Sequence, residues 1–209
     1  MMETKQEGNM MGRDTEVCGD PKIWFPMRVT YQREMKMKAE LDRLGIECFV
    51  PMRYKVVELP LDKLRVRNGG DTELRRELVP AINNLIFVRS TQERISGLKA
   101  SNEVLEPLRY MMDRTASREH AIMTVGDREM ENFMRVASRT DDSVMFLNEE
   151  SVVGKEGKRV MITGGTFEGV TGVVRRVKRC KRVVVELEGI ASVAIAFVPA
   201  GVLKEIEEK

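Results

Sequence analysis

The sequence concentrates its most chemically suggestive side chains between residues 175 and 182. Six of these eight residues are lysine or arginine: Arg175, Arg176, Lys178, Arg179, Lys181 and Arg182. Clustered cations at a hairpin suit the phosphates of RNA or DNA, or an acidic protein face. No aromatic residue is interleaved, which argues against stacking of bases on the cluster. The alternative interpretation is a solvated hairpin tip that charge protects from strand pairing.

A second set of cations lies on and after a predicted helix over residues 30–44. Lys36 and Arg43 lie off the apolar stripe of this helix and could contact nucleic acid. Further cations follow in the next charged segment: Arg53, Lys55, Lys63, Arg65 and Arg67. Carboxylates are interspersed in both regions, so a solvated charged face is the alternative interpretation.

No set of residues indicates catalysis or metal binding. His120 is the only histidine, and the three cysteines (Cys18, Cys48 and Cys180) have no CxxC spacing. The sequence lacks GxSxG, P-loop and HExxH motifs, and no carboxylate lies in an apolar setting that would raise its pKa. We therefore predict a non-enzyme with no catalytic residue, metal or cofactor, in a reducing cytoplasm. No apolar run reaches the ~20 residues of a membrane helix, so we expect no membrane partner.

Hydrophobic periodicity predicts an α+β layer of antiparallel strands and helices before residue 140. The most apolar strand of this layer is Leu85-Ile86-Phe87-Val88, and the last helix carries a buried stripe of methionine, phenylalanine and alanine. In chain order the predicted elements are strand 23–29, helix 30–44, strand 46–52, hairpin or loop 53–77, strand 85–88, helix 95–100, strand 104–112 and helix 125–137.

The last quarter of the chain, Gly157 to Glu205, predicts one small β-barrel punctuated by glycine. Paired glycines suit a tight reversal, and two later glycines flank a strand entry, where a bulge or a close backbone approach is expected. A single aromatic residue lies between the two pairs. The pattern resembles the KOW motif of ribosomal proteins and NusG-type transcription factors, and its residues here are Gly164, Gly165, Phe167, Gly169 and Gly172.

Composition shifts divide the chain into four parts. Residues 1–21 are predicted to be a flexible leader, 22–140 the N-terminal domain, 141–155 a linker and 156–209 the barrel. The linker is polar and rich in carboxylates, so we expect two domains that do not pack together.

The whole chain except the leader resembles NusG. The resemblance rests on Trp24-Phe25, on the run Leu44-Gly45-Ile46-Glu47-Cys48-Phe49-Val50-Pro51 and on Phe87-Val88-Arg89, followed by the KOW barrel. Within that family the chain is most similar to the specialised UpxY and RfaH kind. It departs from the usual Pro-Gly-Tyr turn, because Pro80-Ala81-Ile82-Asn83-Asn84 precedes Leu85 with neither glycine nor tyrosine. The departure favours a divergent paralogue over a general NusG.

The resemblance implies an α+β fold: a NusG-type antiparallel sheet flanked by helices, and an SH3-like five-stranded KOW barrel. It implies a transcription elongation regulator that binds the clamp coiled coil of RNA polymerase and suppresses pausing and termination, as an antiterminator of capsular polysaccharide-type operons. Non-template DNA, and the ribosomal protein NusE or another elongation factor at the barrel, are the further partners it implies.

An apolar patch on the N-terminal sheet is the predicted polymerase contact: Leu85, Phe87, Leu108, Tyr110 and Met112. Strand alternation makes about half of such residues core on any interpretation. The alternative functions are a general NusG elongation factor and a KOW protein that binds ribosomal or other RNA.

Overall fold

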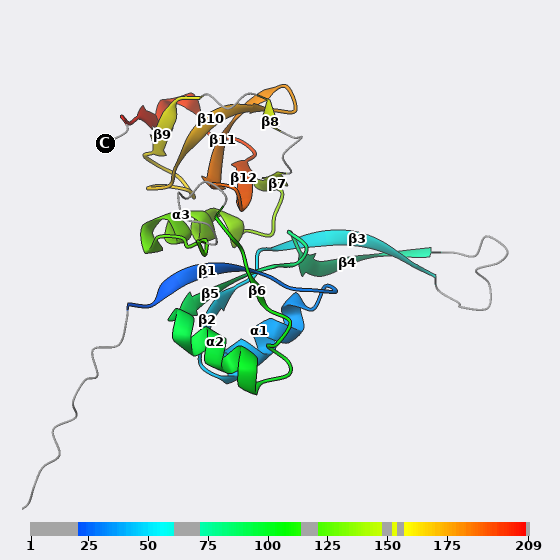
Figure 1. Cartoon of the computed structure of the whole chain (residues 1–209). Helices are drawn as coiled ribbons and strands as arrows, with labels where there is room; N and C mark the ends of the chain where they lie inside the picture. The colour runs from blue at the N-terminus through cyan, green and yellow to red at the C-terminus, as the bar shows by residue number, and fades with distance from the viewer. Residues whose placement is uncertain (1–20, 61–71, 114–120, 148–151, 154–156, 208–209) are drawn as a thin grey trace, which may run out of the picture.

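The computed structural model describes residues 21–60, 72–113, 121–147, 152–153 and 157–207 (Figure 1). Residues 1–20 of the predicted leader lie outside the described residues, as do Cys18 and His120. The cations Lys63, Arg65 and Arg67 of the segment after the second strand lie outside them too.

The N-terminal half contains a four-stranded antiparallel sheet in the order β2-β5-β1-β6. Its strands are Ile23–Arg28 (β1), Glu47–Phe49 (β2), Leu85–Ser90 (β5) and Arg109–Tyr110 (β6). Side chains alternate between the two faces, so Ile86 and Val88 of β5 enter one core while Leu85 and Phe87 enter another. The sheet is therefore covered on both sides.

Two helices cover the first face. They are Glu34–Arg43 (α1) and Gln92–Ser101 (α2), and Met37, Leu41 and Ile95 enter the core from them. The first helix begins later than the sequence predicts, because Tyr31 and Gln32 adopt φ values of 61° and 52°, in the left-handed region. Thr30 therefore does not cap it, whereas Thr91 caps α2 by accepting a hydrogen bond from the Arg94 N–H at 3.2 Å.

A two-stranded ribbon projects from the sheet region (Figure 1). It pairs Met52–Pro60 (β3) with Thr72–Pro80 (β4) in an antiparallel register with Met52 opposite Pro80. Four of its large apolar or aromatic side chains are exposed: Tyr54, Val56, Leu74 and Leu78. The charged segment after the second strand thus forms the hairpin that the sequence allowed.

A third helix, Asp127–Ala137 (α3), covers the second face of the N-terminal sheet. Its apolar stripe is continuous and buried, and consists of Met130, Phe133, Val136 and Ala137. Gly126 occupies the N-cap position in an extended conformation.

The C-terminal half is a second antiparallel sheet, with strands in the order β13-β9-β10-β11-β12-β7 and β8 also paired to β10. The ends of that order are β13 and β7, so the closed five-stranded barrel stays a prediction. The strands are Val144–Leu147 (β7), Val152–Val153 (β8), Arg159–Ile162 (β9), Thr171–Val177 (β10), Cys180–Leu187 (β11), Ala191–Ile195 (β12) and Leu203–Glu205 (β13), with the 3-10 helix Ala200–Val202 (η3) before the last.

Two of these strands lie within residues 141–155, the segment that the sequence predicts to be a linker. Val144–Leu147 pairs with β12, with Val144 opposite Ile195, and Val152–Val153 pairs with β10. The physical reason is the apolar run Val144-Met145-Phe146-Leu147, which gains burial by adding a strand to the sheet.

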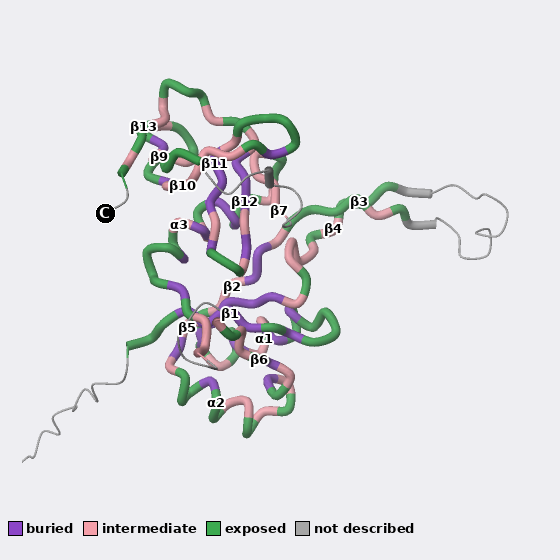
Figure 2. The backbone as a smooth tube through the Cα atoms, turned by 45° about the horizontal axis from the view of Figure 1, so that its top comes forward, coloured by how far each residue is buried: buried purple, intermediate pink, exposed green. Residues whose placement is uncertain are grey.

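The two halves also pack together, contrary to the expectation of separate domains. One continuous core joins Leu85 and Phe87 of the N-terminal sheet, the apolar stripe of α3 and the inner face of the C-terminal sheet, where Val185 and Val193 are buried. Figure 1 shows α3 between the two sheets, and Figure 2 shows buried segments on both sides of it. The carboxylates of the connection do not prevent this contact, because α3 forms it and Val144 and Phe146 of the connection pack against the same core.

Candidate partner-binding and nucleic-acid surfaces

The five residues of the predicted polymerase patch do not form one surface. Leu85 and Phe87 are 2% and 0% exposed and face α3, whereas Leu108 is 1% exposed and lies in the core on the opposite side of the sheet. Tyr110 is half-buried, and only Met112 is exposed. Alternation along β5 and the cover of helices on both faces place Leu85, Phe87 and Leu108 in the core of the free chain, and polymerase binding by the five residues stays a prediction.

An aromatic cluster explains why α3 covers Phe87. The ring centroid of Phe87 lies 5.8 Å from that of Phe133 on α3 and 6.4 Å from that of Phe49 on β2. Phe133 and Phe49 are themselves 6.5 Å apart with nearly perpendicular rings. Aromatic pairs at these distances attract one another beyond the burial of their area.

Tyr110 has a structural role in the opposite core. Its hydroxyl donates to the carbonyl oxygen of Gln92 at 3.2 Å, and its ring meets Phe25 edge-on at 5.5 Å. The Lys99 ammonium lies 5.0 Å from the centre of the same ring. Burial raises the pKa of Tyr110 and lowers that of Lys99, as expected for groups whose charged forms lose hydration.

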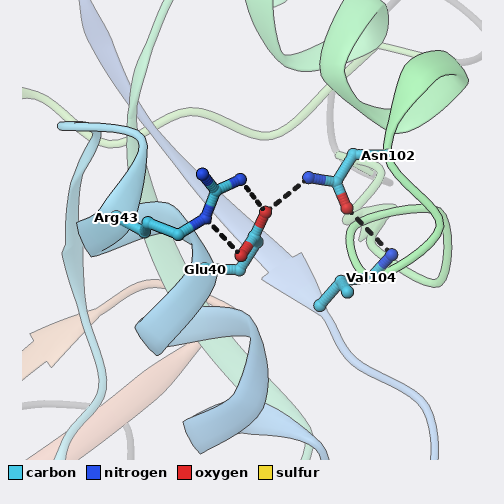
Figure 3. A network of polar contacts seen from close by, with 4 residues as sticks. All are labelled: Glu40, Arg43, Asn102 and Val104. Carbon is cyan, nitrogen blue, oxygen red and sulfur yellow. Dashed lines mark hydrogen bonds and ion pairs between the residues drawn. The ribbon is translucent and has the colours of Figure 1, made fainter.

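The two candidate nucleic-acid contacts on α1 differ in availability. Lys36 is exposed, whereas the Arg43 guanidinium donates two hydrogen bonds to Glu40, at 2.7 and 3.0 Å. Glu40 also accepts a hydrogen bond from the side-chain amide of Asn102 at 2.6 Å, which links α1 to the segment after α2 (Figure 3). These donors lower the pKa of Glu40 to about 2, with the Arg43 bond as the largest cause. Arg43 is therefore held in a local network, and Lys36 is the freer cation.

The basic run at 175–182 forms the hairpin between β10 and β11, and its cations divide into two groups. Arg175 pairs with Glu186 at 2.9 Å, and Arg182 donates to the carbonyl oxygen of Ala196 at 2.6 Å. Both side chains are largely covered and hold neighbouring strands together. The remaining four are exposed: Arg176, Lys178, Arg179 and Lys181.

The turn of this hairpin has an unusual backbone. Val177 pairs with Cys180, so Lys178 and Arg179 form a two-residue loop, and their φ values are 47° and 69°. Positive φ at both positions defines a type I′ turn, which matches strand twist and favours Asn-Gly. Side chains with a Cβ are strained there, and here both are cationic.

The predicted KOW residues lie in one turn and the strand that follows it. Gly165 and Gly169 adopt φ values of 85° and 81°, which only glycine accepts without strain. A Cβ on Gly172 would lie 2.6 Å from the carbonyl oxygen of Val184 on β11, so the close approach expected from the sequence is present. Gly164 has no positive φ, and Phe167 is half-buried against the core shared by the two sheets.

Sequence reasoning missed two polar or aromatic features of the C-terminal half. The side chain of Asn132 on α3 accepts from the Thr171 N–H at 2.9 Å and donates to the Thr171 carbonyl oxygen at 2.7 Å. Phe197, after β12, is 78% exposed. The only signals were an asparagine on the polar flank of a helix and a phenylalanine followed by Val-Pro.

Among the residues that the structure describes, no group of three or more His, Cys, Asp or Glu side chains could hold a metal ion. Within the same ranges, no helix is long and apolar enough to cross a membrane.

These features define an α+β protein in which a helix-flanked antiparallel sheet packs, through one helix, against a second antiparallel sheet. The family model described as "Transcription termination factor nusG" matches residues 22–134. That match spans more than half of the 209 residues, and the chain belongs to the NusG family. Membership implies a role in transcription elongation or termination and binding to RNA polymerase. No curated protein matches the chain.

Proposed function

We propose that this chain is an operon-specific antiterminator, which binds the clamp coiled coil of RNA polymerase and suppresses pausing and termination. The observation that carries the proposal is the family match over residues 22–134, which spans the N-terminal sheet, α1, α2 and most of α3. The C-terminal sheet, whose glycine pattern resembles KOW, recruits a further partner such as NusE. Non-template DNA contacts Lys36 on the exposed side of α1.

The turn before β5 supports a specialised member of the family over a general one. Asn84 occupies this turn with a φ of 60°, and its carbonyl oxygen accepts from the Val29 N–H at 3.1 Å. Its side chain accepts from the Gln32 N–H at 3.2 Å, and its own N–H donates to the buried carboxylate of Glu34. An asparagine tied to the start of α1 thus stands where the family commonly presents a tyrosine.

On this proposal the polymerase-binding face is the apolar side of the N-terminal domain that carries Phe49, Phe133 and Met134. In the free chain the C-terminal sheet packs on that side, through the core shared with Val185 and Val193. A helical coiled coil docks through apolar side chains on an apolar surface of its partner. Because the C-terminal sheet covers this surface in the free chain, docking requires the C-terminal sheet to leave α3. Breaking the Asn132 contact with Thr171 should favour that departure.

The test is capture of purified RNA polymerase by the full chain, with Asn132→Ala as the variant and Asn83→Ala, an exposed asparagine on the β4–β5 turn, as the matched control. We expect wild type and the control to capture polymerase equally and Asn132→Ala to capture more. Capture by none of the three folded proteins would contradict polymerase binding.

Transcription through a terminator distinguishes the two kinds of NusG protein. Templates carry either the leader of the operon that encodes this chain or an unrelated leader. Read-through that rises only on the first template is expected of an operon-specific antiterminator. Equal effects on both templates would indicate a general elongation factor, and increased termination would contradict antitermination.

A further inference from the structure

We propose that the tip of the β10–β11 hairpin and Phe197 together bind single-stranded nucleic acid. We call these residues the hairpin surface: Arg176, Lys178, Arg179, Lys181 and Phe197. The inference does not rest on polymerase binding, and it concerns the C-terminal sheet rather than the part of the chain that matches the family.

The cations of the hairpin surface are available to a ligand. All four are exposed, and none of their side chains forms an ion pair or hydrogen bond with another described residue. Their neighbours Arg175 and Arg182 are engaged with Glu186 and Ala196, so the run of six divides into two structural cations and four unpaired ones. Four unpaired cations at one end of a sheet attract a polyanion and release its counterions on binding.

The backbone at the tip supports a function for the two turn side chains. Lys178 and Arg179 have φ values of 47° and 69°, where Asn-Gly is the favoured pair. Strained positions of this kind cluster where the side chains are needed for binding. Two long cations therefore occupy the most projecting positions of the hairpin at some expense in local stability.

An aromatic ring lies at the same end of the sheet. Val183 is opposite Ile195 in the β11–β12 register, and the Arg182 guanidinium reaches the carbonyl oxygen of Ala196 at 2.6 Å. The next residue, Phe197, is thereby placed beside the start of β11, and its side chain is 78% exposed. Sequence spacing separates this ring from the basic run, but strand pairing supplies the aromatic neighbour that the run itself lacks.

The combination selects single-stranded nucleic acid over an acidic protein. An exposed ring offers a flat face for a base, and cations beside it track the backbone phosphates. An acidic peptide needs only the charges. The Ser143 carbonyl oxygen accepts from the Ala196 N–H at 2.7 Å, which brings two aspartates near Phe197. Asp141 is paired with Arg139 at 2.7 Å, whereas Asp142 is exposed, and the four cations of the hairpin surface outnumber this carboxylate.

The principal test uses the double variant Lys178→Asn/Arg179→Gly in the full chain. It removes two cations while it installs the pair that the turn favours, so its unfolding midpoint should equal or exceed that of wild type. Affinity for a fluorescent oligonucleotide of about ten nucleotides is measured against salt. Each phosphate contact contributes about 0.7 to the slope of log K against log salt, so the variant should lose about 1.4 and bind about 25-fold more weakly at 0.1 M.

Two further variants separate charge from stacking. Arg94→Gln/Arg128→Gln removes two exposed cations from the N-terminal domain and is the charge-matched control, for which we expect wild-type affinity. Phe197→Leu keeps an apolar side chain without a flat ring, and we expect affinity to fall about tenfold with the salt slope unchanged. Bound oligonucleotide should also slow alkylation of Cys180, which is exposed at the turn, in a Cys18→Ser background.

Ribo- and deoxyribo-oligonucleotides of one sequence distinguish RNA from DNA as the ligand, and either result supports the surface. The proposal is overturned if wild type binds neither at 50 mM salt, or if Lys178→Asn/Arg179→Gly binds as wild type does. It is also overturned if polyglutamate of equal charge competes fully and Phe197→Leu has no effect, because the surface then recognises acidic protein.

Discussion

At the scale of single residues, Cys48 and Cys180 show how position sets the chemistry of one side chain. Cys48 is half-buried on β2, and burial is the main cause that raises the pKa of its thiol to about 12. Its Sγ also donates to Asp42 at 3.5 Å, close to the Lys38 ammonium that pairs with the same carboxylate. Cys180 is exposed at the β10–β11 turn.

We therefore predict that iodoacetamide at pH 8 alkylates Cys180 at least tenfold faster than Cys48, because the thiolate is the reactive form and little of it exists at Cys48. The measurement is mass spectrometry of the Cys18→Ser protein over time. In urea the two thiols should react at similar rates. Equal rates in the folded protein would show that Cys48 is accessible and ionises normally.

Glu40 gives a prediction with a defined pH direction. Its folded pKa of about 2 lies below its ordinary value of 4.5, so the carboxylate stabilises the fold above pH 4.5, and that contribution is lost as pH falls toward 2. Glu40→Gln should unfold at a lower temperature than wild type at pH 6 and at nearly the same temperature at pH 2. Thermal unfolding at both pH values checks this. If the unfolding temperatures of wild type and Glu40→Gln still differ at pH 2, the substitution removes packing and not a charge interaction.

At the scale of elements, the approach of β10 to β11 depends on one glycine. A Cβ at Gly172 would lie 2.6 Å from the Val184 carbonyl oxygen and 2.8 Å from a methyl carbon of Val183. Both obstacles belong to a buried strand that cannot move freely.

Gly172→Ala should therefore lower the free energy of unfolding by about 1–3 kcal/mol, as overpacking does. The control is Gly201→Ala, at a glycine whose added Cβ would meet no atom within 4 Å, and we expect a change below about 0.5 kcal/mol there. Urea titrations of the three proteins make the comparison. Equal midpoints for Gly172→Ala and wild type would mean that β10 can shift away from β11.

Periodicity predicted most of the segments that form strands and helices, because alternation and 3.6-residue stripes are local properties of the chain. It placed Val144–Leu147 in a linker, and of the strand predicted at 104–112 only Arg109–Tyr110 is a strand. It could not predict which face of a strand is free. The sequence around Leu85 and Phe87 is equally compatible with a docking patch and with a buried core. Their burial becomes evident only from the position of α3, which lies much later in the chain and packs against them. Likewise, Phe197 follows β12 at the end of the sheet that carries the basic hairpin, and only the pairing of β11 with β12 brings the two segments to the same end. Candidate surfaces therefore depend on tertiary contacts that spacing does not encode.

The beginning of α1 is a second case in which local rules were overruled. Thr30 satisfies the usual preference for an N-cap, yet the helix starts at Glu34. The positive φ values of Tyr31 and Gln32 and the hydrogen bond from Gln32 to Asn84 fix this turn against the β4–β5 connection. A contact between residues fifty-two apart in sequence thus sets a helix boundary.

At the scale of the whole molecule, positive and negative charges nearly balance in number, but they are distributed unevenly over the surface. The formal net charge is +2 for 209 residues, while four unpaired cations gather at one end of the C-terminal sheet. A balanced chain does not bind polyanions through its average charge, so any salt-dependent binding reflects local clusters. This is why removal of two cations at the hairpin and of two elsewhere makes a fair comparison.

The two halves of the chain should unfold together in one cooperative transition. The shared core contains Trp24, the only tryptophan, together with buried valines of β11 and β12. We predict that loss of Trp24 fluorescence in urea coincides with loss of amide protection in β11, because neither sheet can expose its side of α3 without disrupting the other.

Asn132→Ala is the variant that should separate the two events. It removes two hydrogen bonds, one to the N–H and one to the carbonyl oxygen of Thr171 on β10, and these bonds tie α3 to the C-terminal sheet. Unpaired groups at a half-buried position cost about 1–3 kcal/mol, and the loss falls on the contact between the halves, not on either sheet. We expect β11 to lose protection at a lower urea concentration than Trp24 loses fluorescence. Distinct transitions already in the wild type would instead show that the halves are independent, and that the shared core contributes little to either.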